Sequence, residues 1–131
     1  NLEIKTRSII MRSNELNKTY KVFQIQLSDA DVDMINDKGH NSVPHHKAKL
    51  DMNFADNIGA LAGDAVDKGY YTHVANISAD GLEGVFHVGN MGPEENIERL
   101  TKMHSLSVAD VVEGPDGIKH VVASSGFAKV D

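Results

Sequence analysis

The chain has 131 residues, contains neither cysteine nor tryptophan, and carries a formal net charge of −6. At this length we expect one hydrophobic core that needs no disulfide or thiolate metal site for stability. The negative charge disfavours a nucleic-acid surface, because affinity for phosphate groups depends on clustered Lys and Arg. Residues 1–12 lack the apolar core of a signal peptide, and no apolar run reaches the roughly 18 residues of a membrane span. We therefore expect residues 1–131 to form a single cytoplasmic domain without a membrane segment.

The N-terminal part of the sequence predicts an arm followed by a strand. Residues 1–17 carry one short apolar cluster, and we expect them to form a partly ordered arm or an edge strand. Residues 20–27 would place Phe23, Ile25 and Leu27 on one face of a strand. Gln24 and Gln26 fall on the other face, so this period of two predicts a strand with one side in water.

Helical signals follow directly. Ser28 and Asp31 predict a helix start, because a hydroxyl can accept bonds from free N–H groups and an acid favours the positive helix end. This helix, over residues 29–37, should end near Gly39. Residues 40–49 contain Pro44 and have no clean period, so we interpret them as a loop. Residues 51–68 predict one longer helix from the three-four spacing of its apolar residues, which are Phe54, Ile58, Leu61, Ala62 and Ala65.

The second half predicts further strands and helices. Residues 70–77 have the composition of a strand, and residues 82–88 predict a short helix broken by the glycines at 89 and 92. Pro93 is expected to open another helix, because a missing N–H costs nothing at the first helical position.

The last third of the sequence predicts a hairpin. Residues 107–112 and 118–123 are rich in β-forming residues, and the Pro115-Asp116-Gly117 triplet between them favours a tight turn. Residues 127–130 can add a further short strand. The whole pattern predicts an α+β fold with a mainly antiparallel sheet, short helices packed on one face, and a C-terminal β-hairpin.

Histidines are the candidates for a metal site. His40, His45 and His46 lie in one segment, close to Asp37 and Asp51. A transition-metal site needs imidazoles and a carboxylate that converge from a rigid scaffold, and this segment contains no His-x-x-x-His step. An exposed polar loop is therefore the favoured interpretation. The metal candidates are His40, His45, His46 and, just before the hairpin, His104.

No catalytic or cofactor-binding residue is predicted. Gly89 and Gly92 precede Pro93, where backbone N–H groups could bind an anion. Glu94 and Glu95 would repel such an anion, so we interpret the glycines as a structural turn. No serine lies in a Gly-x-Ser-x-Gly elbow.

The C-terminal part of the chain resembles a known family. The run from Met103 to Val112 (MHSLSVADVV), the Pro-Asp-Gly turn and the run from Ala123 to Phe127 (ASSGF) are similar to the ending of YodL-like and KfrB-like domains. These are small modules of bacterial plasmids, phages and integrative elements. The resemblance covers residues 82–130 and implies the same hairpin. It implies no catalytic residue, because the family has no established biochemical activity.

These observations favour a non-enzymatic accessory or interaction protein of a mobile genetic element that acts by binding another protein. Enzymatic activity stays an open question. The alternative is a small metal-binding protein or metal-dependent hydrolase that uses the histidines. Binding to nucleic acid is disfavoured by the net charge. The edges of a small antiparallel sheet can pair across a two-fold axis, which leaves a homodimer open.

Overall fold

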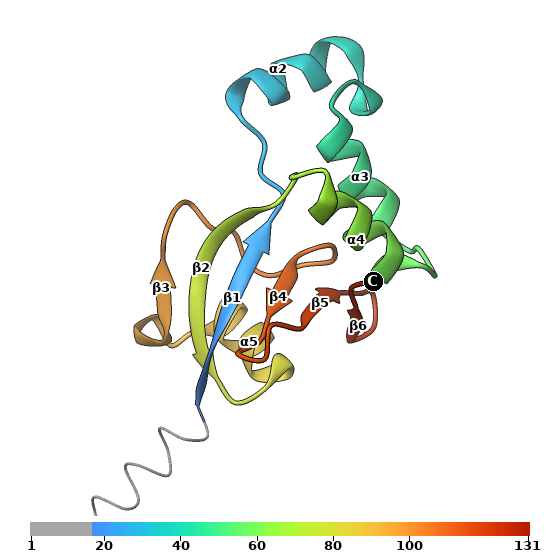
Figure 1. Ribbon diagram of the computed structural model, residues 1–131. Coiled ribbons are helices and arrows are strands. Elements are labelled where there is room, and N and C mark those ends of the chain that lie inside the picture. Colours follow the sequence, from blue (N-terminus) through green and yellow to red (C-terminus); the bar gives the residue numbers. More distant parts are fainter. Residues whose placement is uncertain (1–16) are drawn as a thin grey trace, which may run out of the picture.

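Within residues 17–131, which the computed structural model describes, one six-stranded antiparallel sheet is accompanied by four α-helices (Figure 1). The strands are β1 (Lys18–Gln24), β2 (Thr72–Ala79), β3 (Ile97–Arg99), β4 (Val111–Glu113), β5 (Lys119–Val122) and β6 (Phe127–Lys129). The helices are α2 (Asp29–Lys38), α3 (Pro44–Met52), α4 (Ile58–Asp67) and α5 (Leu82–Met91), with short 3₁₀ turns η1 (His40–Ser42) and η2 (Glu94–Asn96). The predicted α+β class and antiparallel sheet are confirmed. The arm or edge strand expected at residues 1–17 lies outside the described residues, except for Asn17.

The strand order β3-β2-β1-β4-β5-β6 places β1 inside the sheet. Tyr20 of β1 is paired with Ile77 of β2, and Val22 of β1 is paired with Val112 of β4. Both neighbours of β1 therefore come from distant parts of the chain. None of the helices in residues 17–131 is both long and apolar enough to cross a membrane.

The two faces of the sheet carry two separate cores. Val111 and Val112 are consecutive in β4, so their side chains point to opposite faces. Val112 joins the core under α5, together with Val85 and Val88 of that helix. Val111 joins the core under α4, together with Ile58. Short helices were expected on one face of the sheet, but helices lie on both: α5 covers one face and α4 covers part of the other.

Small residues allow α4 to lie close to the C-terminal segment. A Cβ atom added at Gly59 would lie 2.3 Å from the carbonyl oxygen of Lys129, and one added at Gly63 would lie 2.4 Å from that of Asp131. Side chains at these positions would collide with backbone, which cannot move aside cheaply. The glycines that lower helix propensity in α4 therefore permit this packing.

Two helical predictions require correction between residues 40 and 68. The predicted loop at 40–49 instead contains η1 and most of α3, because Pro44 stands in the first turn of a helix, where its missing N–H costs nothing. The single helix predicted at 51–68 is broken after Met52 and resumes at Ile58. Phe54, assigned to the apolar stripe, lies in the break with a φ of 65° and is 90% exposed. Asn and Asp residues on both sides of Phe54 favour turns over helix.

The helix predicted after Pro93 is also wrong. Only η2 forms there, and Ile97–Arg99 continue as β3 along the edge of β2. By contrast, the predicted hairpin is confirmed: Gly114 donates to the carbonyl of Ile118, and β5 and β6 add a second reversal. Strand β4 is shorter than predicted because residues 107–110 form a turn, closed by a bond from the Asp110 N–H to the Ser107 carbonyl.

Candidate binding surfaces

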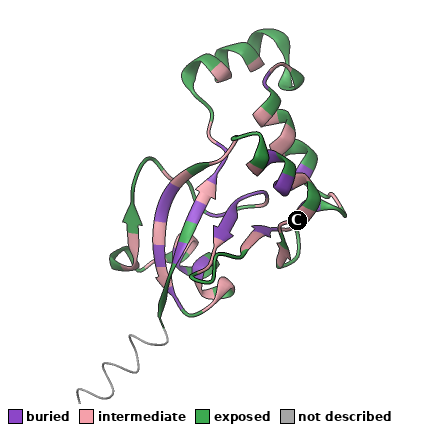
Figure 2. Cartoon of the chain, in the orientation of Figure 1, coloured by how far each residue is buried: buried purple, intermediate pink, exposed green. Residues whose placement is uncertain are grey.

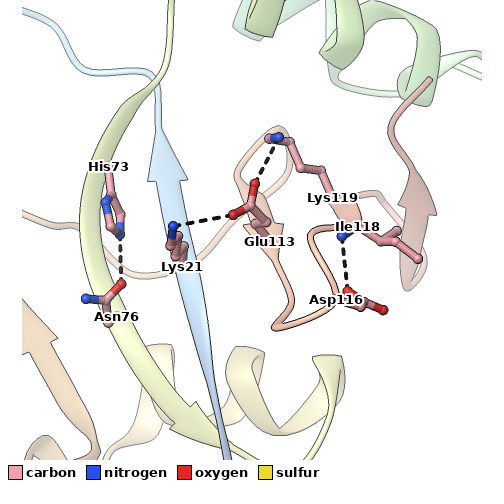
Figure 3. A network of polar contacts seen from close by, with 7 residues as sticks. All are labelled: Lys21, His73, Asn76, Glu113, Asp116, Ile118 and Lys119. Atoms are coloured by element: carbon pink, nitrogen blue, oxygen red, sulfur yellow. Dashed lines mark hydrogen bonds and ion pairs between the residues drawn. The ribbon is translucent and has the colours of Figure 1, made fainter.

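A row of polar side chains crosses the open part of the sheet on the face that α4 partly covers. Its members are cross-strand neighbours on five successive strands and run in the order Glu98, Asn76, Lys21, Glu113 and Lys119. Glu113 lies 3.7 Å from the Nζ atom of Lys21 and 2.9 Å from that of Lys119 (Figure 3). Asn76 donates to Glu98 and also contacts His73, at 2.7 and 2.8 Å. We call these five residues the polar row.

The charges of the polar row compensate one another. Both lysines lie beside Glu113, and the bond from Lys119 is the main reason why the pKa of Glu113 is lowered. Glu98 is paired with Asn76 and accepts a hydrogen bond from it. His73 is occupied by a stack on Phe23, with ring centroids 5.0 Å apart, and by Asn76. A surface whose charges already have partners offers little attraction to a charged ligand. The polar row therefore forms the solvent-facing part of this face of the sheet, and we do not consider it a binding site.

A buried polar network attaches the segment before β4 to β1. Gln24 is fully buried, so the prediction that it faces water is wrong. Its amide donates to the His104 carbonyl at 2.9 Å and to Asp110 at 3.1 Å, and its Oε1 accepts from the His104 N–H. Because β1 lies between two strands and under α5, its second face has no access to water. Gln24 supplies the polar partners that the segment 104–110 would otherwise lack.

Asp110 is the buried ionisable group of this network. Its Oδ2 accepts from the Ser107 N–H at 2.9 Å and from Gln24, whereas its Oδ1 has no hydrogen-bond partner among residues 17–131. Burial raises the pKa of Asp110 to about 6, against the opposing effect of the Ser107 N–H. In the same region the Tyr71 hydroxyl donates to the Ala109 carbonyl, and burial raises the pKa of Tyr71. These polar groups hold the turn at 107–110 in place.

Two of the four metal candidates come together. Nδ1 of His40 and Nε2 of His46 lie 3.0 Å apart, which is a hydrogen bond between two rings. Burial and the neighbouring charge of His40 lower the pKa of His46. A neutral histidine ring can accept a hydrogen bond from the N–H of the other ring. This contact brings η1 against the first turn of α3.

The other two candidates lie elsewhere. Nε2 of His45 lies 2.9 Å from Asp31 of α2, where backbone and side-chain bonds lower the pKa of the aspartate. His104 directs Nδ1 to the Ser105 carbonyl, at the start of the segment that Gln24 anchors. Across residues 17–131, no three His, Asp or Glu side chains converge as metal ligands would. The structure therefore divides the candidates into a histidine pair, a histidine–aspartate pair and a separate histidine.

A groove of about 680 Å³ lies between α5 and the β5–β6 hairpin. Apolar side chains contribute most of its lining, with Leu106 and Val122 in its floor and Phe86 of α5 at its side. The polar side chains that line it are Glu83, Ser107 and Ser124. A concave surface of this size and composition is typical of binding sites. We call this surface the groove.

A second candidate surface is α2, which projects away from the sheet (Figure 1). Within the described part of the chain, α2 contributes no buried residue, and most of its length is exposed (Figure 2). Its inner side meets its neighbours through half-buried groups, Asp31 against His45 and Ile35 close to η1. Ser42 of η1 also donates to the Met34 carbonyl. Its start is fixed locally, because Ser28 accepts from the Asp31 N–H and Asp31 accepts from the Ser28 N–H. We call residues 27–42 the arm; from here on this name does not refer to residues 1–17.

The outer side of α2 carries a stripe of like charges. Asp29, Asp33 and Asp37 follow at steps of four, which places them on one side of the helix, and all three are exposed. No ion pair forms with any of them among residues 17–131. Val32 and Met34 flank the stripe and are 42% and 41% exposed. We call the three aspartates the acidic stripe.

Comparisons of the chain with protein-family models, curated proteins and solved structures find no match. The resemblance to YodL-like and KfrB-like domains therefore stays a prediction. The sequence contained a signal for the acidic stripe, since its spacing of four is visible in the printed residues. It contained none for the groove, whose lining comes from α5, the 106–108 segment and the hairpin.

Proposed function

We propose that this protein is a non-enzymatic accessory protein of a mobile genetic element, and that it acts by binding another protein through the arm. The proposal rests on the acidic stripe and on the observation that α2, which bears it, buries no residue in the described part of the chain. The resemblance of residues 82–130 to mobile-element domains supports the biological setting.

Helix α2 lacks what usually holds a short helix in place. A helix of 10 residues is marginal in water by itself, and helices of this length are normally stabilised by burial of one face. Like charges four residues apart oppose the helix by roughly 0.2–0.5 kcal/mol per pair. A partner that covers this helix would supply the missing burial and relieve the repulsion.

The chemistry of the outer side specifies the kind of partner. Three carboxylates flanked by Val32 and Met34 complement a basic surface that contains an apolar depression. Because Val32 and Met34 lie on opposite sides of the stripe, this partner would meet apolar side chains on either side of its basic surface. A second copy of the arm does not meet this requirement, because two acidic stripes would repel each other.

The test compares two variants that lose the same charge. In D29N/D33N/D37N the acidic stripe is neutral, and in D56N/D67N/D80N three exposed aspartates outside the arm are neutral. Each protein is used to capture partners from a host lysate, and any captured protein is purified and titrated against all three chains. We expect the stripe variant to bind about ten-fold more weakly, since each exposed charge pair contributes roughly 0.2–1 kcal/mol.

The result also depends on salt and on the flanking residues. Wild-type affinity should fall as salt is raised, and this dependence should be smaller for the stripe variant than for the control variant. V32S/M34S should weaken binding without changing the salt dependence. Equal affinity of both charge variants for the purified partner would contradict the proposal.

A further inference from the structure

We propose that the groove binds an extended peptide segment that adds a strand to the free edge of β6, inserts an apolar side chain beside Phe86, and places a basic residue at Glu83. This site is separate from the arm and does not depend on the function proposed for it.

The groove exists because α5 covers only part of its face of the sheet. Gly89 of α5 lies so close to Leu106 that an added Cβ would be 2.6 Å from that side chain, and α5 packs mainly on β2. The β5–β6 hairpin extends past the helix. Val122 and Phe127, which are paired across the hairpin, face the space that α5 leaves open.

Main-chain groups of β6 are available at the same place. Ala123 donates to the Gly126 carbonyl and Val130 donates to the Lys119 carbonyl, so these are hydrogen-bonded pairs. Hydrogen-bonded and non-hydrogen-bonded pairs alternate in an antiparallel ladder. Phe127 is therefore in a non-hydrogen-bonded pair with Val122, and its N–H and C=O point away from β5. Because β6 is at the end of the sheet, these groups face the free edge.

The free edge is short, which limits where a segment can pair. Towards the C-terminus, the carbonyl of Lys129 lies against Gly59 of α4. An added strand can therefore pair at Phe127 and continue towards the Ser124–Gly126 turn. Its side chains alternate between the two faces, so every second one enters the groove.

The charge of the groove selects among occupants. Among the described residues that line it, Glu83 is the ionisable one. A segment with Lys or Arg near its apolar residue is favoured, whereas a phosphate backbone is repelled. The arm of a second copy is repelled as well, because of the acidic stripe. An extended segment with a basic and an apolar residue can pair with the edge of β6, fill the space beside Phe86 and neutralise Glu83.

The experiment begins with selection of a probe. A phage library of random nine-residue peptides is selected against the full chain, and one enriched sequence is synthesised with a fluorescent label. We expect enriched sequences to contain apolar residues at alternate positions and at least one Lys or Arg. Enrichment of apolar residues at steps of three and four would instead indicate a helix and overturn the proposal.

Four variants test the position of the probe. Glu83→Lys should weaken binding at least ten-fold, whereas Glu95→Lys, an equal charge change on exposed η2, should change it less than two-fold. Phe86→Ser should weaken binding at least ten-fold, and Leu100→Ser, which removes an exposed apolar side chain outside the groove, should not. Both residues that are changed in the groove are exposed on α5, so the fold does not depend on them.

N-methylation of the peptide tests strand addition directly. Methyl groups placed on successive backbone nitrogens should abolish binding at alternate positions, because only every second N–H of an added strand faces β6. Uniform tolerance of N-methylation would show that the main chain makes no ladder. D29N/D33N/D37N should bind this probe like the wild type. Loss of probe binding in that variant would show that the peptide binds the arm and would overturn the assignment to the groove.

Discussion

Helices α2 and α4 are each 10 residues long, but they are held by different interactions. Helix α4 buries Ile58, Ala62, Gly63 and Ala65 against the sheet and the C-terminal segment. Within residues 17–131, α2 buries no residue and is fixed by its capping box and a few half-buried contacts. The comparison shows that one helix is part of the core and the other presents a surface.

The same contrast appears in the charges. In the polar row each lysine has a glutamate as its neighbour or partner, whereas the acidic stripe places like charges side by side. Selection for stability alone would favour the first arrangement. A surface that is unfavourable in the isolated chain is more easily explained by binding than by folding.

The largest expected effect is a difference in the free energy of unfolding between a substitution in buried α4 and one in exposed α2. Ile58→Ala should lower the free energy of unfolding by about 3–4 kcal/mol, because it leaves a cavity in the core under α4. Val32→Ala should leave it unchanged or raise it by about 0.5 kcal/mol, since the side chain is exposed and Ala favours helix. Urea unfolding of both variants measures the difference. Equal losses would show that α2 is part of the core.

The second expected effect is a pH dependence of the free energy of unfolding that comes from Asp110, in the buried network beside the sheet. The pKa of Asp110 is about 6 in the folded chain and ordinarily 3.8, so the folded state binds more protons between these pH values. The free energy of unfolding should therefore fall as pH rises from about 4 to about 6, by on the order of 2–3 kcal/mol. Asp110→Asn should remove this contribution. Urea titrations at several pH values test it, and an unchanged profile in the variant would assign the dependence to other groups.

The smallest expected effect is confined to the arm. Ser28→Ala removes the cap of α2 and should cost about 1 kcal/mol of local helix stability. Amide hydrogen exchange in α2 should accelerate several-fold, while global unfolding stays at the wild-type value. Ser125→Ala, at an exposed turn, is the matched control. Loss of global stability in Ser28→Ala would mean that the arm and the sheet unfold together.

Local signals in the sequence predicted the parts of the fold that depend on local interactions. The capping residues Ser28 and Asp31 predicted the start of α2, and the Pro115-Asp116-Gly117 turn predicted the hairpin. The α+β class followed from the same patterns.

The failed predictions depended on long-range contacts. Gln24 looks like a solvent-facing residue in sequence and is buried because β4 and the 104–110 segment arrive beside it. Residues 97–99 become an edge strand because β2 is available for pairing. The groove could not be predicted for the same reason, because its walls meet only in the folded chain.

The position of β1 has a consequence for synthesis on the ribosome. This strand is synthesised before both of its neighbours, β2 and β4, and Val22 can meet Val112 only after the residues between them have left the exit tunnel. Until then one edge of an apolar strand has no native neighbour, and such edges are prone to aggregate. We therefore expect the nascent chain to rely on chaperones or on rapid completion of the C-terminal strands.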